Sequence, residues 1–263
     1  MLGWFSLGDT QEHHQQHVLS EEVAGPEPLP QAAEMVRDKL KKAEIIPTVI
    51  DDFLPSLGLH ATWPSHHKRA ELGNTLPPSQ LGDEPSIALH DMRASSQNPT
   101  TTTSSSKKVT YAITLTDPDA PSRNAPAWGE FCHWVAAGVL EPALCDPREP
   151  GPCAPVLSHL REIVRYKAPA PPKGTGLHRY VLLAFVPSNG TTERLRLSRP
   201  GGRKRWGYGG GGGDEGDGDG DGDGDGGGGG DAGKGGTRGV RQWARENGLA
   251  PVGANFIYAK HEE

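Results

Sequence analysis

The sequence is poor in cysteine and contains no long apolar run. Its three cysteines include no CxxC pair, which argues against a disulfide framework and favours a reducing compartment. A bridge between Cys145 and Cys153 is left open as the alternative. No apolar stretch approaches the length of a membrane-spanning helix, so we expect no transmembrane segment. The start of the chain has no basic segment and meets Asp9 early, so we expect no secretory signal.

Common catalytic and cofactor-binding signatures are absent as well. The sequence has no GxSxG nucleophile elbow, no HExxH zinc motif, no Rossmann glycine fingerprint between a predicted strand and helix, and no P-loop. A zinc site built from Cys132, His133 and His178 would lack the usual ligand spacing and a fourth ligand. Aspartate and histidine side chains could do acid–base work, but no nucleophile or metal set completes a mechanism. We therefore expect a protein that is not an enzyme and that holds no cofactor and no metal.

The net charge of −6 is concentrated in one segment. Residues 209–236 contain eight acidic residues and one lysine, a charge of −7, so the remainder of the chain carries +1. A nearly neutral body has no overall field to recruit nucleic acid, and we expect no nucleic-acid partner. The basic run 199–205 is interpreted as a solvated loop, with contact to RNA or an acidic partner as the less favoured alternative.

Composition divides the chain into a tail, one domain and an insertion. Residues 1–29 are polar, rich in histidine and interrupted by prolines, which predicts a disordered N-terminal tail. Residues 30–263 are predicted to form a single domain. The Gly/Asp tract 209–236 cannot pack a core, and it lacks the periodic apolar residues of calcium-binding repeats. We therefore expect it to be a disordered insertion within the domain, which loop-closure entropy tolerates.

The hydrophobic pattern predicts a mainly β fold. Alternating apolar residues indicate a strand over 109–116, and the nearly continuous apolar run 180–186 indicates a strand buried on both faces. Residues 145–159 are interpreted as an irregular insertion. The other predicted elements are helices over 30–46 and 240–247 and strands over 133–140 and 252–260. Because no βαβ rhythm appears, we expect a Greek-key-like arrangement with peripheral helices.

Three polar clusters adjoin the predicted strands. The first is the stretch TDPDAPSR at 116–123, in which two prolines stiffen a turn that carries Asp117 and Asp119. The second is FCHW at 131–134, and the third is GTGLHRY at 174–180. Each cluster places titratable side chains next to an apolar run. We therefore expect these side chains to meet at the ends of strands.

The residue types in the clusters suit an anion. Carboxylates such as Asp117 and Asp119 can accept hydrogen bonds from imidazoles or backbone N–H groups and orient them. His133, His178 and Tyr180 supply donors of the kind that bind phosphate or sulfate, and the last two share one strand face. The alternative is an ordinary aspartate turn beside half-buried histidines whose hydrogen bonds are satisfied locally.

Together, the clusters resemble the signature of the phosphatidylethanolamine-binding protein family, which includes the Raf kinase inhibitor proteins. The resemblance implies an antiparallel β-sandwich of a large central sheet and a smaller second sheet, with peripheral helices and a C-terminal αβ element. It also implies a small pocket for anionic phospholipid head groups. The residues that it assigns to ligand binding are Asp117, Asp119, Pro121, His133, Ala170, Pro172, His178 and Tyr180.

Further motifs resemble the fungal carboxypeptidase Y inhibitor branch of this family. They are GNTLP at 73–77, EFCH at 130–133, PAPP at 169–172, RWGYG at 205–209 and WAREN at 243–247. Cys132 fits this branch, because animal relatives often carry histidine there. Ala168 and Ala170 stand where many members have glycine, and we expect them to narrow the pocket mouth.

The branch resemblance implies a non-enzymatic, monomeric inhibitor of a serine carboxypeptidase. It also implies contacts with Ras-pathway or kinase proteins. The expected location is cytoplasmic, with the vacuole left open as a second compartment. A carrier or sensor of phospholipid or other small anionic ligands, without protease inhibition, is the alternative function. The apolar tip that includes Leu2, Trp4 and Phe5 is a candidate anchor for a protease cleft, with a frayed terminus as the competing interpretation.

Overall fold

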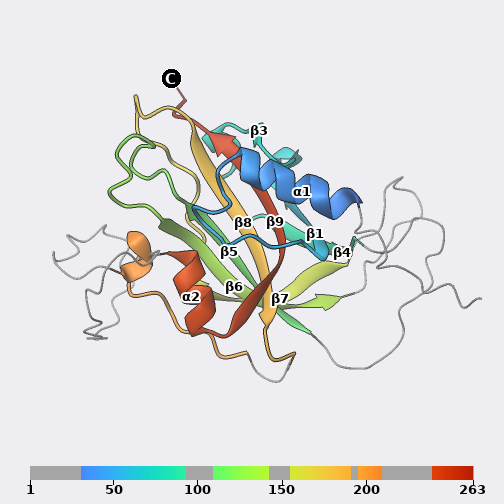
Figure 1. Cartoon of the computed structure of the whole chain (residues 1–263). Coiled ribbons are helices and arrows are strands. Elements are labelled where there is room, and N and C mark those ends of the chain that lie inside the picture. The colour runs from blue at the N-terminus through green and yellow to red at the C-terminus, as the bar shows by residue number, and fades with distance from the viewer. Residues whose placement is uncertain (1–30, 93–108, 142–154, 191–194, 209–238, 263) are drawn as a thin grey trace, which may run out of the picture.

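The structure of the protein is a computed structural model, shown in Figure 1. It describes residues 31–92, 109–141, 155–190, 195–208 and 239–262. The predicted tail and the predicted Gly/Asp insertion lie outside these residues, so the proposed domain boundaries stay predictions. In the described part of the chain, none of the helices is long and apolar enough to cross a membrane.

The described residues form a nine-stranded sheet in the order β2-β1-β4-β7-β6-β5-β8-β9-β3. Neighbouring strands are antiparallel except for the short parallel pair β3–β9. The strands are β1 (Leu57–Trp63), β2 (Lys68–Arg69), β3 (Asn74–Thr75), β4 (Ser86–Asp91), β5 (Thr110–Asp117), β6 (Phe131–Glu141), β7 (Val156–Val164), β8 (His178–Pro187) and β9 (Leu249–Ala259). The helices are α1 (Gln31–Lys42) and α2 (Val240–Glu246), and the 3-10 turns are η1 (Pro64–His66), η2 (Pro78–Gln80) and η3 (Arg205–Gly207).

The sheet folds back on itself to make two layers. The small layer β2-β1-β4 joins the large one through a single residue pair, Ala88 with Val156. Strand β1 also contacts β9 and β8, to which it is not adjacent in the sheet. Leu59 of β1 and Leu89 of β4 share a buried core with Ile257 of β9. The predicted mainly β, sandwich-like class is confirmed, with the two layers linked into one continuous sheet.

The other face of the large layer is covered by helices, which lie on one side of the sheet in Figure 1. Leu40 of α1, Trp206 of η3 and Trp243 of α2 belong to one buried cluster with strand residues such as Val181 and Phe256. Strands β5, β6 and β8 are therefore enclosed between two cores. This double burial explains why residues 180–186 are nearly all apolar, as predicted.

The structure differs from the sequence predictions at strand β7 and at the end of helix α1. Residues 156–159, assigned to an irregular insertion, begin strand β7. His159 has φ of 51° in the middle of this strand, and the pairing of β7 with β6 shifts register twice. These irregularities break the period-two alternation that identifies a strand in sequence. The predicted helix over 30–46 also ends earlier, at Lys42.

A buried carboxyl group connects α2 and η3 to the sheet. Oε2 of Glu130 accepts hydrogen bonds from Oγ1 of Thr116 at 3.2 Å and from the backbone N–H of Val240 at 3.4 Å. Nε1 of Trp206 donates to the same threonine oxygen at 3.0 Å. Gly239 has φ of 151°, and a Cβ there would lie 2.1 Å from Oε1 of Glu130. The first residue before α2 must therefore be glycine for the carboxyl group to fit.

Burial is the main cause that raises the pKa of Glu130 from 4.5 to about 8. The Val240 N–H, the Thr116 hydroxyl and the charges of Arg241 and Arg179 oppose this rise. At neutral pH the folded protein therefore keeps this carboxyl protonated, whereas the unfolded chain ionises it. The contribution of this group to the free energy of unfolding is fully present below pH 4.5, and it is lost as the pH rises from there through about 8.

The substitution Glu130→Gln should remove this pH dependence, because an amide stays neutral throughout. Relative to the wild type, the variant's free energy of unfolding should increase between pH 4.5 and 8. The slope should be up to about 1.4 kcal/mol per pH unit, with a plateau above that range. Urea titrations at several pH values measure it, with the exposed Glu71→Gln as the control. Parallel stability curves for Glu130→Gln and the wild type would contradict the assignment.

Candidate ligand-binding site

A cavity of about 200 Å³ opens where β5 ends and where β6 and β8 begin. Because these strands are antiparallel neighbours, the end of β5 lies beside the starts of the other two. The lining residues are Asp117, Ala120, Pro121, Trp128, Phe131, His133, Lys167, Ala168, Ala170, Pro171, Pro172, His178, Tyr180 and Lys204. Seven of the eight sequence-predicted site residues are among them, and Asp119 is not.

A chain of hydrogen bonds runs along one wall of the cavity. Nδ1 of His178 lies 2.9 Å from Oδ2 of Asp117, and both side chains are buried. Nε2 of the same ring lies 2.8 Å from Oγ1 of Thr175. That hydroxyl also donates to the carbonyl oxygen of Pro172 at 2.7 Å. The proline-rich arm is thereby connected to the carboxylate of Asp117.

Proton counting defines the direction of this chain. Thr175 has one hydroxyl proton, and the Pro172 carbonyl can only accept. When that proton goes to Pro172, Nε2 of His178 must be the donor to Thr175. Nδ1 on the other side of the ring contacts Asp117, so one imidazole bridges the carboxylate and the hydroxyl of Thr175.

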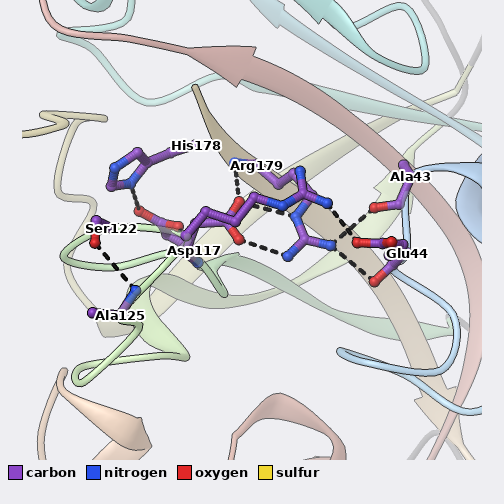
Figure 2. A network of polar contacts seen from close by, with 9 residues as sticks. Ala43, Glu44, Asp117, Ser122, Ala125, His178 and Arg179 are labelled. Atoms are coloured by element: carbon purple, nitrogen blue, oxygen red, sulfur yellow. Dashed lines mark hydrogen bonds and ion pairs between the residues drawn. The ribbon is translucent and has the colours of Figure 1, made fainter. Parts of the chain in front are cut away.

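Asp119 makes a second set of buried contacts, with Arg179, and Figure 2 shows Arg179 beside Ala43 and Glu44. Its carboxylate accepts from Nη2 of Arg179 at 2.6 Å and from Nε at 2.9 Å, and also from the Arg179 backbone N–H at 2.8 Å. Nη1 of Arg179 donates to the carbonyl oxygens of Ala43 and Glu44, which follow α1. The two charged residues are only 1% and 4% exposed, so the pair supports the fold from behind the cavity.

Strand geometry explains why Asp117 and Asp119 have partners on opposite faces of the sheet. Adjacent residues of a strand point to opposite faces, so His178 faces the cavity while Arg179 faces α1. Asp117 contacts His178 on the cavity side, and Asp119 contacts Arg179 on the helix side. The backbone N–H of Asp119 donates to Oδ1 of Asp117 at 2.7 Å, which holds the two carboxylates in a fixed relation.

His133 and Tyr180 form the aromatic part of the wall. The Nδ1 of His133 lies 2.7 Å from the carbonyl oxygen of Lys167, and the two rings meet edge to face at 5.1 Å. Burial lowers the pKa of His133 to about 4, so the ring is neutral, with Nδ1–H as donor to Lys167 and Nε2 as an acceptor. Burial first, and then the charge of Asp117, raise the pKa of Tyr180, so the phenol keeps its proton.

Two lysines complete the site. Lys167 and Lys204 both line the cavity, and Nζ of Lys204 lies 5.0 Å from the ring centroid of Trp128. Trp128 is 40% exposed. Sequence analysis missed these three residues and Thr175, because all lie in loops where no periodic pattern predicts direction. Thr175 was within the GTGLHRY cluster, so its spacing of three from His178 was the available signal.

Nothing in the described ranges forms a metal centre of three or more ligands. No group of three histidine, cysteine, aspartate or glutamate side chains there is arranged to hold a metal ion. Cys132 is fully buried in the core on the helix side of the sheet, while its neighbour His133 faces the cavity. Burial also raises the pKa of the Cys132 thiol.

Asp119→Asn should destabilise the fold, because Arg179 would remain buried without its counter-charge. We expect a loss of about 3–5 kcal/mol in the free energy of unfolding, measured in urea. The double substitution Asp119→Asn with Arg179→Met should recover part of the loss. Arg37→Gln, which breaks the exposed pair with Asp52, is the control and should cost much less. Equal effects of the two single substitutions would contradict the structural role of Asp119.

Comparison with known proteins gives the family. The family model described as phosphatidylethanolamine-binding protein matches residues 66–257. Carboxypeptidase Y inhibitor of Saccharomyces cerevisiae is 29% identical over 233 residues, which are 85% of this chain and 94% of the inhibitor. CEN-like protein 1 of Nicotiana tabacum is 29% identical over 64% of this chain and 80% of its own.

Solved structures agree with these sequence matches. The crystal structure of carboxypeptidase Y inhibitor complexed with the cognate proteinase gives a TM-score of 0.63 at 27% identity, covering 88% of this chain and 97% of that one. The phosphatidylethanolamine-binding protein from Plasmodium vivax gives a TM-score of 0.54 at 18% identity, covering 86% and 97%. The second likeness concerns the fold. Since the family match spans well over half of the sequence, this chain belongs to the phosphatidylethanolamine-binding protein family.

Proposed function

We propose that this protein inhibits a serine carboxypeptidase by binding to it, without catalysing a reaction of its own. The observation that carries the proposal is the similarity to carboxypeptidase Y inhibitor, which covers 94% of that protein's length. The structural likeness extends over 97% of the inhibitor chain in the complex with its cognate proteinase. A similarity of this extent covers the whole domain rather than one shared motif.

We also propose that the cavity binds a phosphate-type anion, such as a phospholipid head group. Lys167 and Lys204 supply positive charge, and the Asp117 carboxylate is engaged by hydrogen bonds with His178 and Tyr180. The volume of about 200 Å³ suits a head group and leaves no room for acyl chains. Ligand pockets for larger molecules usually measure about 300–1,000 Å³.

The cavity itself favours a second candidate function. A carrier or sensor of small anionic ligands would need the cavity and no protease contact. Regulation of Ras-pathway or kinase proteins is a prediction that depends on the family resemblance alone. An inhibition assay beside a ligand titration separates the first two functions, because each can fail without the other.

Removing residues 1–29 should weaken inhibition of a serine carboxypeptidase, measured as the inhibition constant with a chromogenic substrate. These residues lie outside the described part, and the prediction rests on their apolar tip, which includes Trp4 and Phe5. The domain would supply a second contact, and loss of one of two linked contacts lowers affinity through effective concentration. The cavity variant His178→Ala is the control and should inhibit like the full chain.

Two outcomes of this assay would overturn parts of the proposal. A truncated chain that inhibits as strongly as the full chain would place the inhibitory surface on the domain. A full chain that does not inhibit at all, while binding small anions normally, would leave the carrier or sensor function.

His178→Ala should weaken binding of phosphoethanolamine by several-fold or more, measured by calorimetry. The variant loses a donor and leaves the Asp117 carboxylate without its partner, and a hydrogen bond to a charged group is worth about 1.5–3 kcal/mol. Lys204→Gln should act in the same direction. The exposed His66→Ala, at a position that does not line the cavity, is the control. Unchanged affinity in a folded His178→Ala protein would contradict the pocket assignment.

A further inference from the structure

Two histidines meet on the small layer, outside the cavity. His60 lies on β1 and His90 on β4, and both are half-buried. Neither lines the cavity described above. Their ring nitrogens, Nε2 of His60 and Nδ1 of His90, are 3.0 Å apart. The ring centroids are 4.7 Å apart, and the ring planes differ by 27°.

The neighbouring positions make room for this contact. In the register of β1 and β4, His90 stands opposite Gly58 and His60 stands opposite Ala88. Each imidazole therefore faces a small residue, and the two rings meet along the diagonal between the strands. A Cβ on Gly58 would lie 1.9–2.6 Å from three atoms of the His90 ring. The contact depends on glycine at this position.

The contact does not serve hydrophobic packing. The side chains that the small layer contributes to the core, such as Leu59 and Leu89, belong to the opposite face of the two strands. At this distance the two facing nitrogens share one proton. When that proton moves to the other nitrogen of its own ring, both facing nitrogens offer a lone pair that a metal ion can bind.

We propose that His60 and His90 together bind one divalent transition-metal ion, with Cu²⁺ or Ni²⁺ preferred to Zn²⁺ and with water as the remaining ligands. Metal–imidazole bonds are about 2.0–2.1 Å long. Two nitrogens that stay 3.0 Å apart then subtend an angle of roughly 94° at the metal. This is close to the cis angle of square-planar or tetragonal sites and smaller than the tetrahedral angle that zinc adopts.

One nearby charge opposes the ion. Arg69 of β2 is paired with Thr62 of β1 and acts electrostatically on His60. Its positive charge should weaken cation binding without preventing it, because Arg69 is exposed and solvent screens the interaction. Arg69→Gln should therefore tighten binding.

The test is a titration of the full-length chain with Cu²⁺ and, separately, Zn²⁺, followed by calorimetry and by electron paramagnetic resonance for Cu²⁺. All proteins carry His13→Gln, His14→Gln and His17→Gln, because these N-terminal histidines could bind the same ions. We expect one Cu²⁺ with two coordinated nitrogens, bound more tightly than Zn²⁺. His60→Asn and His90→Asn should each lower the Cu²⁺ affinity by at least about tenfold, since chelation by two linked ligands is lost.

Two further variants keep the test selective. His67→Asn removes an exposed histidine of the same layer, at a position with φ of 50° that asparagine tolerates, and should leave Cu²⁺ binding unchanged. Gly58→Ala keeps both histidines but displaces the His90 ring, and should weaken binding as much as the loss of a histidine. Melting curves without metal check that each variant folds.

Two results would overturn the proposal. One is equal Cu²⁺ affinity in the parent chain and in both single-histidine variants. The other is tighter binding of Zn²⁺ than of Cu²⁺ to these residues. Both measurements are independent of protease inhibition and of anion binding. Failure of the metal site would therefore leave the proposed function untouched, and the reverse also holds.

Discussion

The buried ion pair between Asp119 and Arg179 is the constraint on which the site depends. A buried charge without a partner costs several kcal/mol, so the two residues must meet. Arg179 also donates to the carbonyls of Ala43 and Glu44, which brings the end of α1 to the same place. The turn after β5, the start of β8 and α1 are thereby fixed together. Asp119 then orients Asp117 through its backbone N–H, and Asp117 orients His178.

Within one short motif, Asp119 supports the fold and Asp117 lines the cavity. Asp117 and His178 face the cavity, whereas Asp119 and Arg179 face the helix. The two pairs lie on opposite sides because the adjacent strand residues His178 and Arg179 point to opposite faces of the sheet. The separation keeps the arginine charge away from the ligand. Positive charge at the cavity comes instead from Lys167 and Lys204, which reach it from loops.

The sequence allowed the fold class and half of the cavity lining to be predicted, because the polar clusters beside the apolar strands carry the family resemblance. The contact of Asp119 with Arg179 could not be predicted, because a buried arginine looks in sequence like an ordinary surface residue. Lys204 was also missed, since it reaches the cavity from a loop about 70 residues away from His133. Strand β7 was missed for a different reason, the left-handed backbone of His159, which disrupts the alternation.

The proline-rich arm sets the size of the ligand that the cavity can take. Ala168 and Ala170 both line it, beside Pro171 and Pro172. Because prolines fix the backbone φ, the alanine methyl groups cannot retreat as glycine-containing loops can. The Thr175 hydroxyl further ties the end of the arm to Pro172 and His178. For the anion site proposed above, we therefore expect a compact phosphate group to fit better than a larger phosphorylated ligand.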